Sequence, residues 1–161
     1  MIVFLESLDA PGTPEGPARR PVLRLGEKGL VPSVLAVASG DSILLENTTG
    51  IYHRLFSYSE SNPFDLGVLR RGEARSVGLG APGVVRIYCS LHPSERAVVF
   101  VAPSPHFVTF RPPAGYEIRD VPAGRYRLHA WSESAPAPSR TVTVPSGAAV
   151  SAEISPPAAP E

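Results

Sequence analysis

Proline and glycine recur along this chain so often that little room remains for long helices. The 161 residues include 19 prolines and 14 glycines, which separate short runs rich in the residues that favour strands. Runs such as "SILLEN" (42–47) and "TVTV" (141–144) alternate side chains between two faces, as half-buried antiparallel strands do. Many short strands with turn signals between them predict an all-β protein built as a sandwich or barrel.

The predicted strands follow one another along the whole chain. Each is a run of apolar, β-branched or aromatic residues bounded by residues that favour turns. We expect strands at Ile2–Leu8, Pro21–Leu25, Ser33–Ala38, Ser42–Glu46, Tyr52–Ser57, Phe64–Arg70, Ala74–Gly78, Val84–Cys89, Arg96–Val101, Phe107–Phe110, Tyr116–Ile118, Arg125–Trp131, Thr141–Val144 and Ala149–Ile154.

Two Pro-rich stretches divide the sequence into modules. The first is "DAPGTPEGPARR" (9–20) and the second is "APSP" (102–105). Segments of this composition are typical of domain boundaries, and we expect a compact domain at residues 29–102. Residues 1–28 and 103–156 are then expected to form an accessory module, into which the compact domain is inserted.

Charge and hydropathy exclude several classes of partner. The 15 basic and 15 acidic side chains are mixed along the chain, so no basic face for nucleic acid is expected. No apolar run approaches about 20 residues, so we expect no membrane span. The start "MIVFLESLDA" lacks the basic region of a signal peptide, which leaves a cytoplasmic protein or an exported one without its signal. The tail 157–161 is predicted to be disordered from its composition, and no oligomeric state is favoured.

A single cysteine stands at the end of a predicted strand in "RIYCSLHPSERAVVFV" (86–101). One cysteine cannot form an internal disulfide, and His92 follows Cys89 by three residues. His53 lies in the turn-rich stretch "NTTGIYHRLFSYS" (47–59), which leads into another strand of the same predicted domain. Because the ends of distant strands meet at one pole of a sandwich, we expect His53 beside the Cys89–His92 loop.

Two imidazoles and one thiolate form a donor set that suits copper, with a longer fourth contact completing the site. These donors accept either oxidation state of copper, which an electron carrier requires. Cysteine, two histidines and a carboxylate also suit a closed tetrahedral zinc site. The remaining alternative is that Cys89 and both histidines are packing or surface residues that bind no metal.

The sequence "VVRIYCSLHPSE" (84–95) resembles the ligand loop of the cupredoxins, the family that includes plastocyanin and amicyanin. "YCS" (88–90) matches the residues around the copper thiolate of plastocyanin, and the Cys-x-x-His-Pro spacing is similar to the short loop of amicyanin. Upstream, "VPSVLAVASGDSILLENTTGIYHRLFS" (31–57) is similar to the cupredoxin segment that carries the first histidine ligand. The resemblance covers about residues 30–101.

This resemblance implies a Greek-key β-sandwich that holds one copper ion, which cycles between Cu(II) and Cu(I). It implies that His53, Cys89 and His92 bind the copper, with Cys89 conducting the electron and His92 as the exposed exit ligand. It further implies single-electron transfer without enzymatic activity, a redox partner protein, and a periplasmic or otherwise extracytoplasmic location. The alternative function is copper carriage or sensing, or capture of a small ligand at the copper.

Glu95 is the main departure from the cupredoxin pattern. Cupredoxins with a loop of this length have methionine at this place, whereas the only methionine of this chain is Met1. If Glu95 binds as the axial ligand, we expect it to favour Cu(II), lower the reduction potential and give a red or green centre. If Glu95 turns to solvent, toward Arg96 or Arg54, the metal keeps an open position for a small ligand.

Three further polar residues of the sequence have alternative interpretations. Asn47 is expected to fix the His53 loop through hydrogen bonds from its side chain to the backbone, or else to be an ordinary turn residue. The triplet that it begins, Asn-Thr-Thr, also fits a glycosylation sequon. His106 and His129 have no cysteine or carboxylate at ligand spacing, and we expect both to lie outside the metal site.

The accessory module carries a second resemblance. The stretch "PPAGYEIRDVPAGRYRLHAW" (112–131) resembles the end of transthyretin-like or carboxypeptidase-regulatory sandwich domains, and residues 2–25 resemble their opening strands. This resemblance implies a second small β-sandwich, formed by the N- and C-terminal segments, that serves as an adhesion or docking scaffold. A first strand paired within the sheets of the 29–102 domain would contradict this arrangement.

Overall fold

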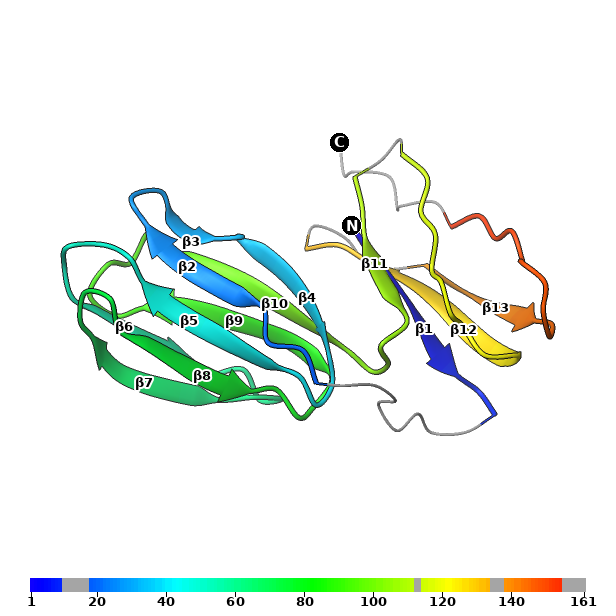
Figure 1. Cartoon of the computed structure of the whole chain (residues 1–161), viewed down its shortest axis with the longest axis horizontal. Coiled ribbons are helices and arrows are strands. Elements are labelled where there is room, and N and C mark those ends of the chain that lie inside the picture. The colour runs from blue at the N-terminus through cyan, green and yellow to red at the C-terminus, as the bar shows by residue number, and fades with distance from the viewer. Residues whose placement is uncertain (10–17, 112–113, 134–137, 155–161) are drawn as a thin grey trace. The chain divides into compact units, whose positions relative to one another are not determined.

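The structure, a computed structural model, describes four stretches of the chain, which are residues 1–9, 18–111, 114–133 and 138–154. Within them all regular secondary structure is strand (Figure 1), so the all-β prediction is confirmed. The strands are β1 (Ile2–Ser7), β2 (Val22–Gly26), β3 (Gly29–Val31), β4 (Val34–Ala38), β5 (Ser42–Asn47), β6 (His53–Ser57), β7 (Phe64–Leu69), β8 (Ala74–Gly78), β9 (Gly83–Cys89), β10 (Arg96–Ala102), β11 (Phe107–Thr109), β12 (Gly124–Trp131) and β13 (Ser139–Val144).

Two segments named in the sequence predictions lie partly or wholly outside the described residues. The predicted disordered tail, residues 157–161, lies outside the described residues, as do residues 10–17 of the first Pro-rich stretch. No helix of membrane-spanning length and hydropathy occurs in the described part of the chain.

The chain divides into two compact units. The terminal unit contains Met1–Glu15 and Pro103–Glu161, and the central unit contains Gly16–Ala102. β1 pairs with β11 on one side and with β12 on the other. Strands that precede and follow the central unit in sequence therefore share one sheet, and β1 does not pair within the central sheets.

Residues 18–28 were expected in the accessory module, but the structure places them in the central unit. β2 pairs in parallel with β5 and in antiparallel fashion with β3, and its Leu23 and Leu25 are fully buried in the central core. Apolar alternation shows that a strand is half-buried without identifying the sheet that it joins. β3, which was not predicted, is a short strand that forms a hairpin with β2.

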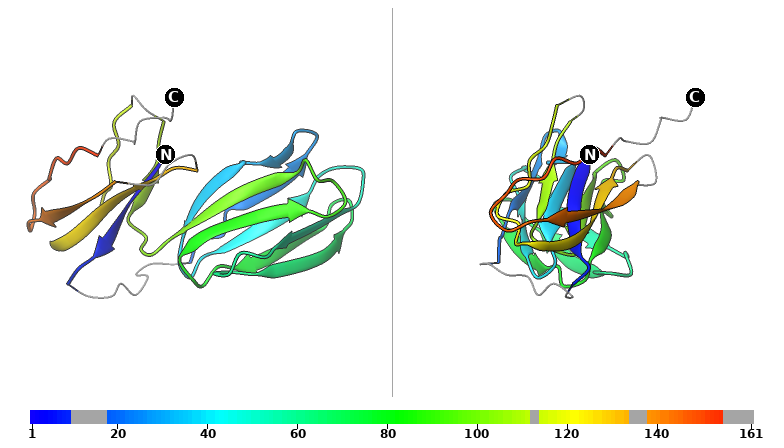
Figure 2. Two further views of the ribbon diagram at one scale, coloured as in Figure 1. Left: turned by 180° about the vertical axis from the view of Figure 1, so that it is seen from behind. Right: turned by 90° about the vertical axis from the view of Figure 1, so that its right-hand side faces the viewer.

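The central unit is a sandwich of two sheets (Figure 2). One sheet has the strand order β4-β10-β9-β6-β7, and the other has the order β3-β2-β5-β8. Leu45, Leu55 and Ile87 are among the fully buried side chains of the core between them. β10 and β4 are parallel, as are β2 and β5, which requires crossover connections of the Greek-key kind.

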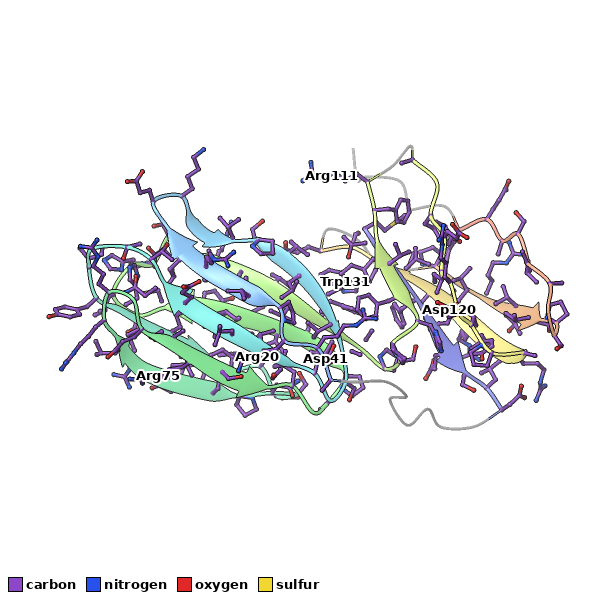
Figure 3. All side chains as sticks on the ribbon, in the orientation of Figure 1. Arg20, Asp41, Arg75, Arg111, Asp120 and Trp131 are labelled. Atoms are coloured by element: carbon purple, nitrogen blue, oxygen red, sulfur yellow. The ribbon has the colours of Figure 1, made fainter. Side chains whose placement is uncertain are left out.

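Two side chains labelled in Figure 3 make hydrogen bonds that hold edge segments of this sandwich in place. The guanidinium of Arg75 in β8 donates hydrogen bonds to the carbonyls of Leu66 and Val68 in β7. Asp41, in the turn before β5, accepts a 2.7 Å hydrogen bond from the backbone N–H of Arg19. The first contact joins edge strands of the two sheets, and the second fixes the segment that leads into β2.

The terminal unit contains one four-stranded sheet, in the order β11-β1-β12-β13. Val3, Leu5 and Leu128 are buried on one face of this sheet. The side chains packed against this face from irregular segments include Tyr116, Ile118, Val121, Ala152 and Ile154. The sheet is therefore covered by chain that is not itself a sheet.

Strands were predicted at Tyr116–Ile118 and Ala149–Ile154, but both segments are irregular in the structure. Asp120 has a φ of 57°, and Pro122 has no N–H to donate, so a strand cannot continue past Ile118. Just before the second segment Gly147 has a φ of 70°, and alanine, which occurs twice within it, has low strand propensity. The second layer of the predicted accessory sandwich is therefore irregular chain.

Candidate metal centre

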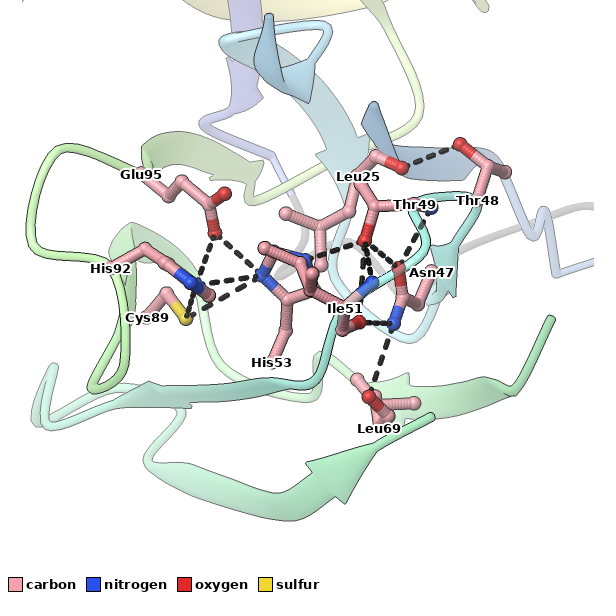
Figure 4. A network of polar contacts seen from close by, with 10 residues as sticks. All are labelled: Leu25, Asn47, Thr48, Thr49, Ile51, His53, Leu69, Cys89, His92 and Glu95. Atoms are coloured by element: carbon pink, nitrogen blue, oxygen red, sulfur yellow. Dashed lines mark hydrogen bonds and ion pairs between the residues drawn. The ribbon is translucent and has the colours of Figure 1, made fainter. Parts of the chain in front are cut away.

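Three strand ends of the central unit bring the predicted metal donors together. His53 is the first residue of β6, Cys89 is the last residue of β9, and Glu95 directly precedes β10. β6 and β9 are antiparallel with Leu55 opposite Cys89, so the start of β6 lies beside the end of β9. Figure 4 shows the side chains of these three residues and of His92 gathered at this point.

A tight turn between β9 and β10 carries His92 and Glu95 back toward Cys89. The N–H of Glu95 donates to the carbonyl of His92 over 3.0 Å, and the N–H of Cys89 donates to the carbonyl of Glu95 over 3.2 Å. The N–H of Ser90 donates to the carbonyl of Arg54 over 3.0 Å. The turn is therefore fixed both internally and to the neighbouring strand β6.

The four potential donor atoms lie within 4.8 Å of one another. Cys89 Sγ is 3.8 Å from His53 Nδ1 and 3.6 Å from His92 Nδ1, and the two Nδ1 atoms are 3.2 Å apart. Glu95 Oε2 is 2.8 Å from His53 Nδ1 and 3.8 Å from His92 Nδ1. The structure thus brings together all four residues that the sequence indicated.

The separations among the sulfur and the two nitrogens fit three ligands of one metal ion. Ligand bonds are about 2.3 Å for a thiolate and about 2.0–2.1 Å for an imidazole. At angles between tetrahedral and trigonal, two such nitrogens are about 3.3–3.6 Å apart, and sulfur and nitrogen are about 3.6–3.8 Å apart. The observed distances of 3.2, 3.6 and 3.8 Å are close to these values, so the donors need little rearrangement to reach one ion.

Burial differs between the two sides of this donor group. His53 is fully buried and Cys89 is 3% exposed, whereas the side chains of His92 and Glu95 are 32% and 14% exposed. The group is therefore closed on the side of His53 and Cys89 and open to solvent on the side of the β9–β10 turn.

Glu95 points into the donor group and does not pair with Arg54. Its Oε2 contacts the imidazole of His53, while the Arg54 guanidinium makes a bidentate contact with the Asp65 carboxylate at 2.6 and 3.2 Å. Arg54 holds the pKa of Asp65 below its usual range, because its guanidinium donates to the ionised carboxylate. Of the two orientations expected for Glu95, the structure has the one that faces the other donors.

The imidazole of His53 is held on its far side by Thr49, whose Oγ1 is 2.7 Å from His53 Nε2. Asn47 is fully buried and donates through Nδ2 to the carbonyls of Ile51 at 2.8 Å and Leu69 at 3.1 Å. These bonds confirm the side-chain-to-backbone role predicted for Asn47. Thr49 is missed by the sequence analysis, which interprets the two threonines of the Asn-Thr-Thr triplet only as part of a sequon. A hydroxyl four residues before a candidate ligand histidine could have indicated it.

The other two histidines belong to the terminal unit. His129 stacks on Phe4 with ring centroids 4.8 Å apart, and its Nε2 is 3.1 Å from Oε2 of Glu6. That carboxylate comes from β1, so no spacing around His129 could predict it. Among the described residues, the only cluster of three or more potential metal donors is the one formed by His53, Cys89, His92 and Glu95.

No protein-family model matches this sequence, and no curated protein matches it. Solved structures do match. A purple cupredoxin from Nitrosopumilus maritimus is 20% identical with a TM-score of 0.46, and the match covers 51% of this chain and 99% of that chain. A reduced amicyanin variant is 19% identical with a TM-score of 0.46, over 50% of this chain and 79% of that chain.

A copper-containing nitrite reductase from Thermus scotoductus is 19% identical with a TM-score of 0.49. The match covers 58% of this chain and only 25% of the reductase. The purple cupredoxin and amicyanin belong to the family that residues 84–95 resemble. All three likenesses are distant, so the choice of metal for this chain rests on its own donor atoms.

Proposed function

We propose that the central unit binds one copper ion through His53, Cys89 and His92 and transfers single electrons. The observation that carries this proposal is the set of three distances among Cys89 Sγ and the two Nδ1 atoms. One thiolate and two imidazoles are the donor set of copper sites that transfer electrons. We propose a carrier of electrons and not an enzyme.

Bound copper would alternate between Cu(II) and Cu(I), and so accept and release one electron. The contribution of the chain is a fixed set of donors. His53 and Cys89 are buried residues at the ends of paired strands, and the turn that carries His92 is hydrogen-bonded internally and to β6. Donors held in this way move little when the charge at the site changes, so electron transfer needs little reorganisation.

We propose that a redox partner protein exchanges electrons at His92. The His92 side chain is 32% exposed while that of His53 is fully buried. The adjacent Leu91 is 50% exposed, so apolar surface flanks the accessible imidazole. On the resemblance of the ligand loop, we place this exchange in the periplasm or another extracytoplasmic compartment.

We propose Glu95 as the fourth ligand. Its Oε2 lies 2.8 Å from a donor nitrogen of the group, and its side chain is 14% exposed. Because an anionic oxygen stabilises Cu(II) more than Cu(I), Glu95→Gln should raise the reduction potential measured by voltammetry. Glu95→Met should raise the potential further and shift the visible absorption toward that of a blue centre. Unchanged potentials in both variants would remove Glu95 from the ligand set.

Capture of a small ligand at the copper is a second candidate function. It is favoured by the position of Glu95 Oε2, which is 1.0 Å nearer to His53 Nδ1 (2.8 Å) than to His92 Nδ1 (3.8 Å). A carboxylate displaced toward His53 leaves room for a small ligand on the side of His92. It is also favoured by the exposure of His92, since solvent can reach the site from that side. Slow reduction accompanied by anion or nitric oxide binding would favour this candidate, whereas rapid reversible reduction without ligand uptake would favour electron transfer.

The experiment that tests the proposed function is a titration of the metal-free protein with Cu(II), followed by visible absorption. We expect an intense thiolate-to-copper band that saturates at one equivalent and is absent in Cys89→Ser. A parallel titration with Zn(II) distinguishes copper from the structural zinc site that the same donors could form. Binding of Zn(II) with no band from Cu(II) would overturn the electron-transfer proposal.

A further inference from the structure

The side-chain amide of Asn47 has one orientation that satisfies its neighbours. Two backbone carbonyl oxygens, from Ile51 and Leu69, face its Nδ2 at 2.8 and 3.1 Å, and a carbonyl oxygen can only accept hydrogen bonds. Nδ2 must therefore be the donor toward both, and Oδ1 must face the other way, toward Thr49. Because Asn47 is fully buried, no solvent competes for this amide.

The hydroxyl of Thr49 has a single hydrogen to donate. Its Oγ1 is 2.7 Å from Asn47 Oδ1, which accepts only, and 3.3 Å from the Ile51 carbonyl. Oδ1 also accepts the backbone N–H of Thr49 at 2.9 Å, so backbone and side chain of Thr49 are fixed by the same atom. The Thr49 hydrogen therefore lies on the shorter contact, toward Asn47 Oδ1 (Figure 4).

Two contacts of the Thr49 hydroxyl remain. Oγ1 accepts the backbone N–H of Ile51 over a long 3.4 Å, which uses no hydroxyl hydrogen, and it lies 2.7 Å from His53 Nε2. Since the Thr49 hydrogen points toward Asn47, Oγ1 can only accept along this contact, and Nε2 must carry the donated hydrogen. The other ring nitrogen, Nδ1, is the one that faces Cys89 Sγ and His92 Nδ1. The chain of bonds that starts at buried Asn47 thus reserves Nε2 for a hydrogen and leaves Nδ1 to be a ligand.

With this pattern Nδ1 meets Glu95 Oε2 at 2.8 Å. An imidazole nitrogen without its hydrogen and a carboxylate oxygen both present lone pairs. At this distance they therefore need a proton or a metal ion that both can contact. In the alternative pattern the Thr49 hydroxyl donates to Nε2, and the ring hydrogen of His53 is on Nδ1. That hydrogen would then occupy the position that a metal needs. The direction of the Thr49 hydroxyl hydrogen therefore determines which ring nitrogen of His53 is free to bind a metal.

We propose that Thr49, oriented by Asn47, is a positioning residue that presents His53 to the metal as an Nδ1 ligand. This inference rests on the proposed metal-binding function. Hydrogen-bond partners of ligand histidines fix the tautomer and the ring orientation, and their loss typically lowers metal affinity by about 10–100-fold. Thr49→Val should therefore weaken Cu(I) binding by about 10–100-fold, whereas Thr49→Ser keeps the hydroxyl and should bind as the unchanged protein does.

Thr48 provides a matched control in the same turn. Its hydroxyl also makes a hydrogen bond, but to the carbonyl of Leu25 at 2.5 Å and not to His53. Thr48→Val therefore removes the same chemical group one residue away and should leave Cu(I) affinity unchanged. Equal losses of affinity in Thr48→Val and Thr49→Val would show that the effect comes from the turn as a whole and would overturn the proposal.

The second measurement is the NMR signal of the His53 Nε2–H, in metal-free protein and in protein loaded with Cu(I). We expect this hydrogen to be present and protected from exchange with solvent in the unchanged protein and in Thr49→Ser, and to lose that protection in Thr49→Val. Absence of the signal from the unchanged protein would overturn the proposal even if Thr49→Val does not fold. If the unchanged protein shows this signal but binds no metal, the proposed function fails while the hydrogen-bond assignment stands.

Discussion

The central unit covers its five-stranded sheet with a second sheet, whereas the terminal unit covers its four-stranded sheet with irregular chain. In a second sheet the backbone N–H and C=O groups pair with neighbouring strands, so backbone geometry fixes the layer. In the terminal unit, side chains provide such links, as when the Tyr116 hydroxyl donates to the carbonyl of Ala152 at 2.9 Å. The two covering layers are therefore held by different kinds of bond.

This difference bears on where a metal site can be built. Donor atoms that must stay within a few tenths of an ångström of one arrangement need a support that does not relax. His53 and Cys89 stand at the ends of paired strands of the central unit. Irregular chain such as residues 145–154 gives no such support. We therefore expect a core substitution to lower the free energy of unfolding more in the central unit than in the terminal unit.

The largest effect is expected from the central core. Leu55 is fully buried and lies opposite Cys89 in the β6–β9 pair, so Leu55→Ala should lower the free energy of unfolding of the central unit by about 2–5 kcal/mol. Denaturant unfolding combined with hydrogen exchange at β5 and β9 amides measures this loss. Leu91→Ala is the control, because Leu91 is 50% exposed and should change stability by no more than about 0.5 kcal/mol.

A smaller effect is expected from the irregular layer of the terminal unit. Ile118 is half-buried against the sheet, so Ile118→Ala should cost about 1–2 kcal/mol, since less apolar area is lost and the irregular chain can relax. Hydrogen exchange at the β12 amides reports this change. A loss as large as that of Leu55→Ala would break the comparison, because it would show that the irregular layer is packed as tightly as a sheet.

The side-chain link between the two irregular segments should contribute less again. Tyr116→Phe removes one hydrogen bond, to Ala152, and should cost about 0.5–1 kcal/mol in thermal unfolding of the terminal unit. Burial raises the pKa of Tyr116 and likewise that of Tyr126. Both folded-state pKa values exceed the unfolded value of about 10, so the stability that they contribute is present below that pH and lost as the pH rises through the folded pKa.

An alkaline titration of unfolding therefore sharpens the comparison. The terminal unit should lose stability in this range, and the loss should be smaller in Tyr116→Phe, which has no phenol to ionise. An identical alkaline profile for the variant and the unchanged protein would show that the Tyr116 hydroxyl is not held in solution.

The smallest effect is expected from two of the exposed ion pairs, one chosen from each unit. Arg54 lowers the pKa of Asp65 in the central unit, and hydrogen bonds from Arg125 lower the pKa of Asp9 in the terminal unit. Their stabilisation is present above the unfolded pKa of aspartate and lost as the pH falls through the folded pKa. Carboxyl titration by NMR should show both shifts. Arg125→Gln keeps the backbone N–H that donates to Asp9 and removes only the guanidinium, so it should raise the pKa of Asp9 only part of the way toward its usual range. A lowered pKa for only one of the two aspartates would be a difference between the units that the kind of layer covering each sheet does not explain.

Much of the candidate site could be predicted because ligand chemistry depends on residue type and spacing. The three-residue separation of Cys89 and His92 after a strand indicated a metal loop, and the turn before His53 indicated where the third donor would stand. The direction of Glu95 could not be predicted, because either a metal or an arginine could have attracted its carboxylate. The structure turns it inward and leaves Arg54 with Asp65.

The sequence by itself determined most of the strand-forming segments and the donor types of the candidate metal site, because alternation, turn residues and ligand chemistry are local properties of the chain. Only the tertiary structure decided that β2 joins the central sheets, that Tyr116–Ile118 covers a sheet without becoming a strand, and that Thr49 reaches the imidazole of His53. Each of these depends on which segments meet in space, and a hydroxyl, a leucine or an extended backbone has the same local signature whichever partner it finds.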